Sequence, residues 1–137
     1  MWVVYALLAA LFAALTSILA KIGLAHVHAN VATAIRTAVV LIIAWGVVFL
    51  TGRQHDIAHI DHRSFVFLVL SGCATGLSWL FFYRALQIGE ASKVIPIDKL
   101  SVVISMVLAF AFLGEAISIK AVAGGLLIAV GTLVLVL

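Results

Sequence analysis

The sequence predicts an all-α, polytopic membrane protein with five transmembrane helices, and three observations carry this prediction. Of its 137 residues, 66% are hydrophobic and only 9% are charged. This hydrophobic fraction is higher than a soluble protein of this size needs for its core. The apolar runs are about 20 residues long, which is the length of helix that crosses a bilayer core of roughly 30 Å. The runs are also continuous and do not alternate every second residue, so they predict helices and not barrel strands.

The first predicted span covers residues 2–20 and is followed by Lys21. It lacks a basic region before the apolar stretch and a clear small-residue cleavage site, so we expect a membrane span and not a cleaved signal peptide. Lys21 is either an anchor at the membrane interface or a cation that contacts substrate.

The second predicted span covers residues 31–50 and begins near Asn30. Arg36 lies about six residues inside it, or roughly 9 Å at the rise of an α-helix. A guanidinium group stays charged in a membrane, so Arg36 pairs with Asp98, binds an anionic group of a substrate, or reaches back to lipid headgroups.

The longest polar connection, residues 51–64, contains several histidines and carboxylates. His55 and His59 are four residues apart and meet a metal only if the segment is helical. The alternative is an ordinary solvated loop, and no metal site is predicted. Cys73 is the only cysteine, which excludes a disulfide within the chain.

The third predicted span covers residues 65–86 and ends before Gly89. Ser71, Thr75 and Ser78 form a polar stripe along it. The aromatic residues Trp79, Phe82 and Tyr83 follow the stripe. They either stack on a substrate or gate it, or they belong to an interfacial belt.

The fourth predicted span covers residues 94–113, with Ser92 and Pro96 at its start and Gly114 at its exit. It holds Asp98 and Lys99 near its start. An ionised side chain deep in a bilayer costs about 2.5 to 3.5 kcal/mol on insertion scales, so it normally faces protein or water.

Two explanations of this charged pair stay open. In the first, Asp98 forms a substrate or proton site together with Ser101 and Ser105, which share its helical face. In the second, Asp98 is held in a first helical turn by the helix dipole, and Lys99 extends to the membrane interface.

The fifth predicted span covers residues 119–137 and is capped by Ser118. Ala121, Gly125 and Ala129 recur every four residues along it, and such small residues allow close contact between membrane helices. The fourth and fifth spans are expected to form a tight hairpin.

Basic residues do not favour one orientation of the five spans. One side of the membrane carries Arg53, Arg63 and Lys120, and the other carries Lys21, Arg84 and Lys93. Orientation normally follows an excess of basic residues on the cytoplasmic side. Either the chain inserts both ways and forms an antiparallel homodimer about an axis in the membrane plane, or insertion kinetics fix one orientation.

The motif ALQIGEASKVIP at residues 85–96, the pair Leu100-Ser101, the LGE triplet at 113–115 and the glycines of 124–131 resemble the EamA family of the drug/metabolite transporter superfamily. The resemblance covers residues 1–137 as one five-span domain. It implies kinship with longer proteins in which two such inverted halves surround a central cavity and which are secondary transporters, often exporters of metabolites.

The resemblance also implies that the start of the fourth span faces the cavity, and that Glu115 has a structural role at the helix exit. Asp98 and Lys99 stand where the longer family members usually carry uncharged residues, so their substrates are not carried over to this chain.

We therefore expect a secondary transporter, an exporter or exchanger, that moves a small polar or charged metabolite by alternating access. Lys21, Arg36 and Lys99 outnumber Asp98 among the interior charges, which favours an anionic or zwitterionic substrate. Alternatives are a flippase for a lipid-linked headgroup and a non-transporting membrane scaffold.

No nucleotide-binding glycine loop, catalytic triad or hydrolytic carboxylate pair is present in the sequence, so we expect no enzymatic activity and no cofactor. The expected partners are a small-molecule substrate, the lipid bilayer and a second, antiparallel copy of the chain, with no nucleic acid. The expected location is a bacterial or archaeal inner membrane.

Overall fold

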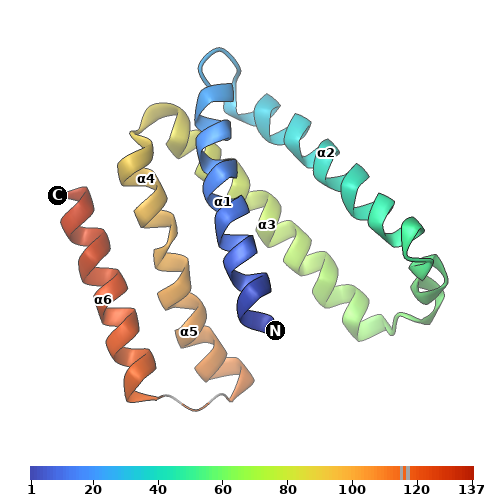
Figure 1. Ribbon diagram of the computed structural model, residues 1–137. Helices are drawn as coiled ribbons and strands as arrows, with labels where there is room; N and C mark the ends of the chain where they lie inside the picture. The colour runs from blue at the N-terminus through green and yellow to red at the C-terminus, as the bar shows by residue number, and fades with distance from the viewer. Residues whose placement is uncertain (115, 117) are drawn as a thin grey trace. The chain divides into compact units, whose positions relative to one another are not determined.

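The computed structural model describes residues 1–114, 116 and 118–137. Throughout these residues the chain is helical and contains no strand. In chain order the helices are α1 (Trp2–Gly23), α2 (Ala29–Leu50), the 3-10 helix η1 (Arg53–His59), α3 (His62–Ile88), α4 (Ala91–Asp98), α5 (Leu100–Leu113) and α6 (Ile119–Val136) (Figure 1). The role predicted for Glu115 falls outside the described residues.

Five segments are long and apolar enough to cross a membrane, and they match the five predicted spans. These are α1, α2, α3, the segment Ala91–Leu113 and α6. No more than 11% of the most apolar stretch of any span is buried within the chain. The fold is therefore that of a multi-pass membrane protein whose apolar side chains are left to lipid or to other protein.

Most helix ends follow the predicted signals. Gly114 ends α5 in the left-handed region at φ 67°, where a residue with a side chain would be strained. The Ser118 hydroxyl accepts a hydrogen bond of 3.0 Å from the Ala121 amide and caps α6 as predicted. The start of α3 lies earlier than predicted, because the Asp61 carboxylate accepts a hydrogen bond of 3.1 Å from the Ser64 amide and caps the helix there.

The fourth span starts earlier than predicted and is divided into two helices. The predicted start at Ser92 and Pro96 is wrong, since α4 begins at Ala91 and contains Pro96 in its interior. Proline has no amide hydrogen to donate to the carbonyl four residues earlier, which weakens the helix around it.

The hydrogen bonding changes directly after this proline. The Lys99 amide donates to the Pro96 carbonyl at 3.1 Å as well as to the Ile95 carbonyl at 3.3 Å, and the Val102 amide donates to the Lys99 carbonyl at 3.0 Å. Hydrogen bonds that span three residues are thus added to the usual four-residue pattern at this point. Lys99 lies between the end of α4 at Asp98 and the start of α5 at Leu100.

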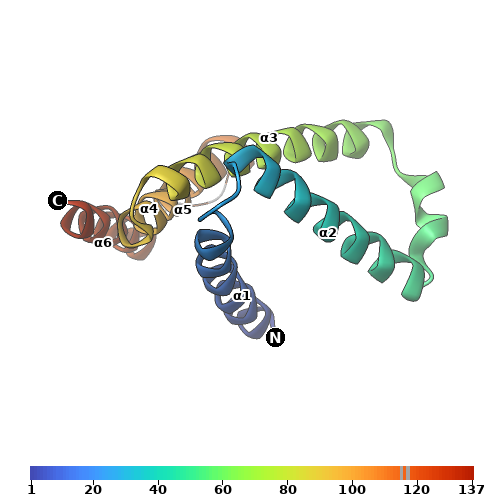
Figure 2. The ribbon, with the colours of Figure 1, turned by 90° about the horizontal axis from the view of Figure 1, so that it is seen from above.

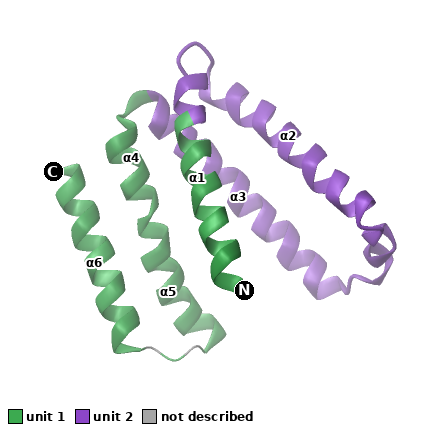
Figure 3. Ribbon diagram, viewed as in Figure 1, with its two compact units in different colours: residues 1–18, 88–137 green, residues 19–87 purple. Residues whose placement is uncertain are grey.

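The chain forms two compact units (Figure 3). Unit 1 comprises residues 1–18 and 88–137. Within it α6 packs against both α4 and α5, and α5 and α6 run antiparallel as the predicted hairpin (Figure 1).

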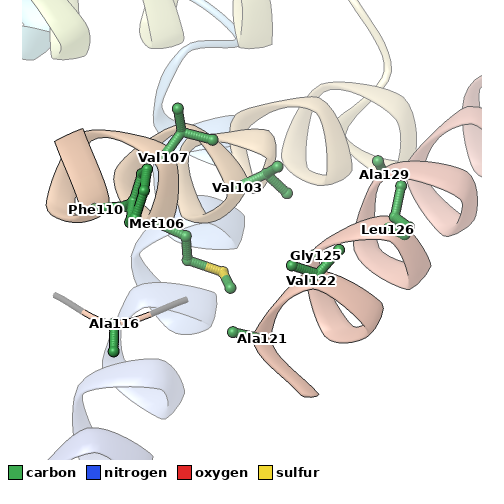
Figure 4. Close-up of a pocket in the computed structure, with 10 residues that line it drawn as sticks. All are labelled: Val103, Met106, Val107, Phe110, Ala116, Ala121, Val122, Gly125, Leu126 and Ala129. Carbon is green, nitrogen blue, oxygen red and sulfur yellow. The ribbon is translucent and has the colours of Figure 1, made fainter. Parts of the chain in front are cut away.

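An apolar groove of about 340 Å³ lies between α5 and α6. Ala121, Gly125 and Ala129 all line it from α6, and Figure 4 shows Met106 extending toward Gly125 from α5. A side-chain carbon added to Gly125 would lie 3.9 Å from Met106. Gly125 therefore lies in ordinary contact distance of α5, whereas the role of Ala121 and Ala129 in helix contacts stays a prediction.

Unit 2 comprises residues 19–87 and includes α2, η1 and most of α3. Figure 2 shows α2 and α3 connected at one end through η1. At the other end, the Gln87 side-chain amide donates a hydrogen bond of 3.0 Å to the Val27 carbonyl and joins the loop before α2 to α3. Leu24, Ala29, Tyr83 and Leu86 are the buried apolar residues here.

Candidate functional site

Polar groups gather at one place in each unit, and the first is the break in the fourth span. Asp98 is the last residue of α4, and Lys99 connects α4 to α5. The Lys99 ammonium lies 3.4 Å from the Asp98 carboxylate, with the two side chains 51% and 35% exposed, respectively. The predicted pair thus exists as an ion pair that other groups can reach.

The helix-dipole explanation of the charged pair requires Asp98 to lie in the first turn of a helix, and its position differs from this. It ends α4 and does not lie in the first turn of a helix, so a favourable dipole at a helix start does not account for this carboxylate. Ser101 and Ser105 follow on α5 and are exposed. Their shared face with Asp98 was predicted for a continuous helix, whereas the hydrogen bonding changes at Lys99 between them.

Thr132 belongs to this site and was missed in the sequence. Its side chain is only 5% exposed, and its hydroxyl donates a hydrogen bond of 3.3 Å to the Pro96 carbonyl. A hydroxyl from α6 thereby supports the backbone just before the break. The available signal was that Thr132 is the lone hydroxyl residue among residues 121–137.

The second polar group surrounds Arg36 in unit 2. The Arg36 guanidinium donates a hydrogen bond to the Tyr83 hydroxyl. It also lies over the ring of Trp79, 4.4 Å from its centroid, and 5.3 Å from the centroid of Tyr83. Trp79 is thus placed beside Arg36, and the role of both residues in binding substrate stays a prediction.

Tyr83 is a further residue of this site, although Trp79 alone of the nearby aromatic residues is among the predicted site residues. It lies four residues after Trp79, on the same face of α3, and this spacing of two aromatic residues was the signal that could have found it. The proposed pairing of Arg36 with Asp98 joins residues of different units and stays a prediction.

Lys21 has a structural contact in unit 2. Its ammonium donates a hydrogen bond to the Leu86 carbonyl, in the last turn of α3. The last carbonyl groups of a helix have no partner within the helix, and a cation at that end also complements the helix dipole. This contact favours the interpretation of Lys21 as an anchor.

Ser71 and Thr75 lie on α3 in the same line of side chains as Trp79. The Thr75 hydroxyl donates a hydrogen bond of 2.9 Å to the Ser71 carbonyl, within the helix. Both residues are exposed, so their role in binding substrate stays a prediction.

The polar connection is partly helical, because His55, Asp56 and His59 lie in η1. Asp56 forms an ion pair of 3.3 Å with Arg53. Within the described residues, no group of three or more histidines, cysteines or carboxylates is placed to hold a metal ion. Hydrogen bonds from Ser64 lower the pKa of the Asp61 carboxyl below its ordinary value.

Five apolar segments long enough to cross a membrane, with polar sites of charged and aromatic groups within them, define a multi-pass membrane protein. Polar sites of this kind mark substrate and ion pathways in membrane proteins. The comparison with known families names the class more closely: the chain belongs to the EamA-like transporter family, whose pattern matches residues 1–137.

A relative supports this assignment. A Sinorhizobium protein described as an uncharacterized transporter in the cobO 3'region is 44% identical over 134 residues, which cover 98% of this chain and 95% of the relative. No solved structure matches the chain. The protein is thus a membrane transporter, and its relative is bacterial.

Proposed function

We propose that the protein is a secondary transporter that exports or exchanges a small polar or charged metabolite by alternating access. The observation that carries this proposal is the ion pair at the break of the fourth span, where Lys99 lies 3.4 Å from Asp98. Many secondary transporters build their substrate and ion sites at interrupted membrane helices, because the interruption supplies backbone groups and charges in one place.

The construction of the break supports this role. Pro96 removes a backbone hydrogen bond from α4, and the Thr132 hydroxyl contacts the Pro96 carbonyl from α6. A membrane interior tolerates irregular backbone where protein or a water-filled cavity satisfies its polar groups. The break is therefore a suitable place for substrate or a proton to meet the chain.

We further propose that two copies of the chain, treated as one domain over residues 1–137, form an antiparallel homodimer. The equal division of basic residues between the two sides of the membrane favours opposed insertion. In such a dimer the two copies take the place of the inverted repeats that other transporters contain in one chain.

Asp98 is the carboxylate that couples transport to protons in this proposal. The test is uptake or exchange of a metabolite pool in proteoliposomes across an imposed pH gradient. We expect Asp98→Asn to abolish the gradient-driven component, because an amide does not take up and release a proton at accessible pH.

Asp56→Asn is the matched control, since Asp56 is a carboxylate in the polar connection with its own ion pair to Arg53. This variant is expected to transport normally. Gradient-driven transport by a well-folded Asp98→Asn protein would contradict the coupling role. Normal transport after joint replacement of Asp98 and Lys99 by apolar residues would instead assign the pair to helix packing.

A further inference from the structure

The guanidinium of Arg36 is held in a fixed place by aromatic groups of α3. Tyr83, which is only 1% exposed, accepts one of its hydrogen bonds. The Trp79 ring lies against the cation at 4.4 Å. An arginine side chain has five N–H donors in a rigid plane, so these contacts orient the group and leave further donors for another acceptor.

No carboxylate of unit 2 neutralises Arg36. Asp56 and Asp61 are the acidic residues among 19–87. Asp56 forms its ion pair with Arg53, and Asp61 caps α3 at Ser64. Aromatic rings attract a cation but carry no net charge, so the guanidinium lacks a countercharge in its own unit and a negatively charged ligand would supply one.

A cavity of about 240 Å³ adjoins this cation. It is lined by Arg36 and Tyr83, together with the apolar residues Ala20, Gly23, Val27, Ala32 and Ile35. Its volume lies below the roughly 300 to 1,000 Å³ of pockets for drug-sized ligands, which suits a small metabolite. Arg36 contributes a positive charge to this lining, Tyr83 contributes a hydroxyl, and the other lining residues are apolar.

We infer that this cavity binds a small monocarboxylate, with its carboxylate on Arg36 and a short aliphatic part against the apolar lining. The planar guanidinium matches a carboxylate with two parallel hydrogen bonds. A phosphate ion would place hydrophilic oxygens against the apolar lining, and burying polar groups without hydrogen bonds is costly. The inference rests on the proposed transport function, for which it names the substrate class.

The test measures binding to the purified full-length protein in a neutral detergent, by isothermal titration with sodium butyrate, butyramide, butylamine and inorganic phosphate as probes. We expect butyrate to bind. Butyramide and butylamine should bind at least about tenfold more weakly, because they lack the carboxylate that accepts charged hydrogen bonds from the guanidinium. Phosphate should also bind at least about tenfold more weakly, because it lacks the aliphatic part that contacts the apolar lining.

Arg36→Gln is expected to weaken butyrate binding at least about tenfold, since it removes the charge and the paired donors. Arg84→Gln is the matched control, because Arg84 adjoins Tyr83 in sequence but is exposed and contacts Gln87 at 3.0 Å. This control variant should bind butyrate as the wild type does.

A second variant tests the cavity if Arg36→Gln fails to fold. Gly23 lines the cavity and has no atom within 4 Å of the place where a side chain would start. Gly23→Leu should therefore fill the space and reduce butyrate binding by a similar factor, with the thermal unfolding temperature retained.

Equal binding of butyrate and butyramide, or full affinity in both Arg36→Gln and Gly23→Leu, would overturn the inference. Binding of phosphate with no binding of butyrate would assign the cation to phosphate groups and overturn it as well. Butyrate binding without any transport in proteoliposomes would leave the site standing and reject the proposed transporter mechanism. Transport of another metabolite without butyrate binding would reject the monocarboxylate site and leave the proposed transporter function standing.

Discussion

Arg36 illustrates how a permanent charge is accommodated inside a membrane span at the scale of one residue. Its cation meets two aromatic rings and a hydroxyl from α3 in place of an acidic side chain of unit 2. A desolvated contact of this kind contributes on the order of 2 kcal/mol, and exposed ones contribute less. The contacts offset part of the insertion cost and leave the charge available to a ligand.

The Asp61 carboxylate is a second residue whose role follows from one contact, the hydrogen bond of 3.1 Å from the Ser64 amide at the start of α3. Hydrogen bonds from the side chain of Ser64 and from its backbone amide lower the pKa of the Asp61 carboxyl in the folded protein. A group with a lowered folded pKa stabilises the protein above its unfolded pKa of about 3.9, and this contribution disappears as the pH falls through the folded value.

We therefore predict that Asp61→Ala lowers the thermal unfolding temperature at neutral pH by a few degrees and that the difference from wild type vanishes in acid. The measurement is thermal unfolding in detergent between neutral pH and about pH 3. Asp56→Ala removes only an exposed ion pair and should have little effect. A constant difference at every pH would rule out the carboxylate as the source.

At the scale of the element, the fourth span departs from a simple membrane helix. Pro96 lies within α4, the hydrogen bonding tightens at Lys99, and α6 supplies the Thr132 hydroxyl. The length and hydropathy of the run were sufficient to predict a span, and proline and the two charges indicated its special character. The Thr132 contact with the Pro96 carbonyl comes from α6, which is far along the sequence, so local pattern alone does not predict it.

Pro96→Ala should make the fourth span a more regular helix. Because proline in a helix interior costs about 3 kcal/mol, we expect the variant to be at least as stable as the wild type. We also expect its transport rate in proteoliposomes to fall about tenfold or more, since the ion pair would no longer lie at a break. Ile97→Ala changes an exposed neighbour without restoring a backbone donor and serves as the control. Unchanged transport in Pro96→Ala would show that the break is dispensable.

Thr132→Val tests the support that α6 gives to this break. The variant keeps the shape of the side chain but loses the hydrogen bond to the Pro96 carbonyl, so we expect a loss of about 1 kcal/mol in the free energy of unfolding. In a Pro96→Ala background the loss should shrink, because the new amide can donate to the Ser92 carbonyl, and a more regular helix turns the carbonyl of residue 96 along the helix axis and away from Thr132. A double-mutant cycle of unfolding free energies measures this difference, and additive effects would disprove the link.

For the whole molecule, the number of spans and the connections between them were accessible from the sequence, because apolar length and cap residues are local properties. Gly114 and Ser118 end and start helices as their types suggest. The contact of Arg36 with Tyr83 joins residues 47 positions apart, and no local pattern specifies such a pairing. The sequence therefore indicates aromatic residues on α3 but does not indicate which of them contacts Arg36.

Opposed insertion gives a prediction for the molecule as a whole. Reporter domains fused after Leu137 should report from both sides of the membrane, because basic residues give neither side an excess. Adding the substitutions Gln54→Lys and His59→Lys to the connection that contains η1 should shift the signal to one side, with that connection in the cytoplasm. One-sided signals from the unaltered chain at every fusion site would exclude dual insertion.

The contact between Arg36 and Trp79 has a practical consequence, since the emission of an indole responds to nearby charge. The chain has three tryptophans, and Trp2→Phe with Trp45→Phe would leave Trp79 as the sole emitter. The Arg36 guanidinium lies 4.4 Å from the centroid of the Trp79 ring. An anion that neutralises this guanidinium would therefore change the electric field across the ring. The protein would then act as its own optical sensor of occupancy, without a label and within an intact bilayer.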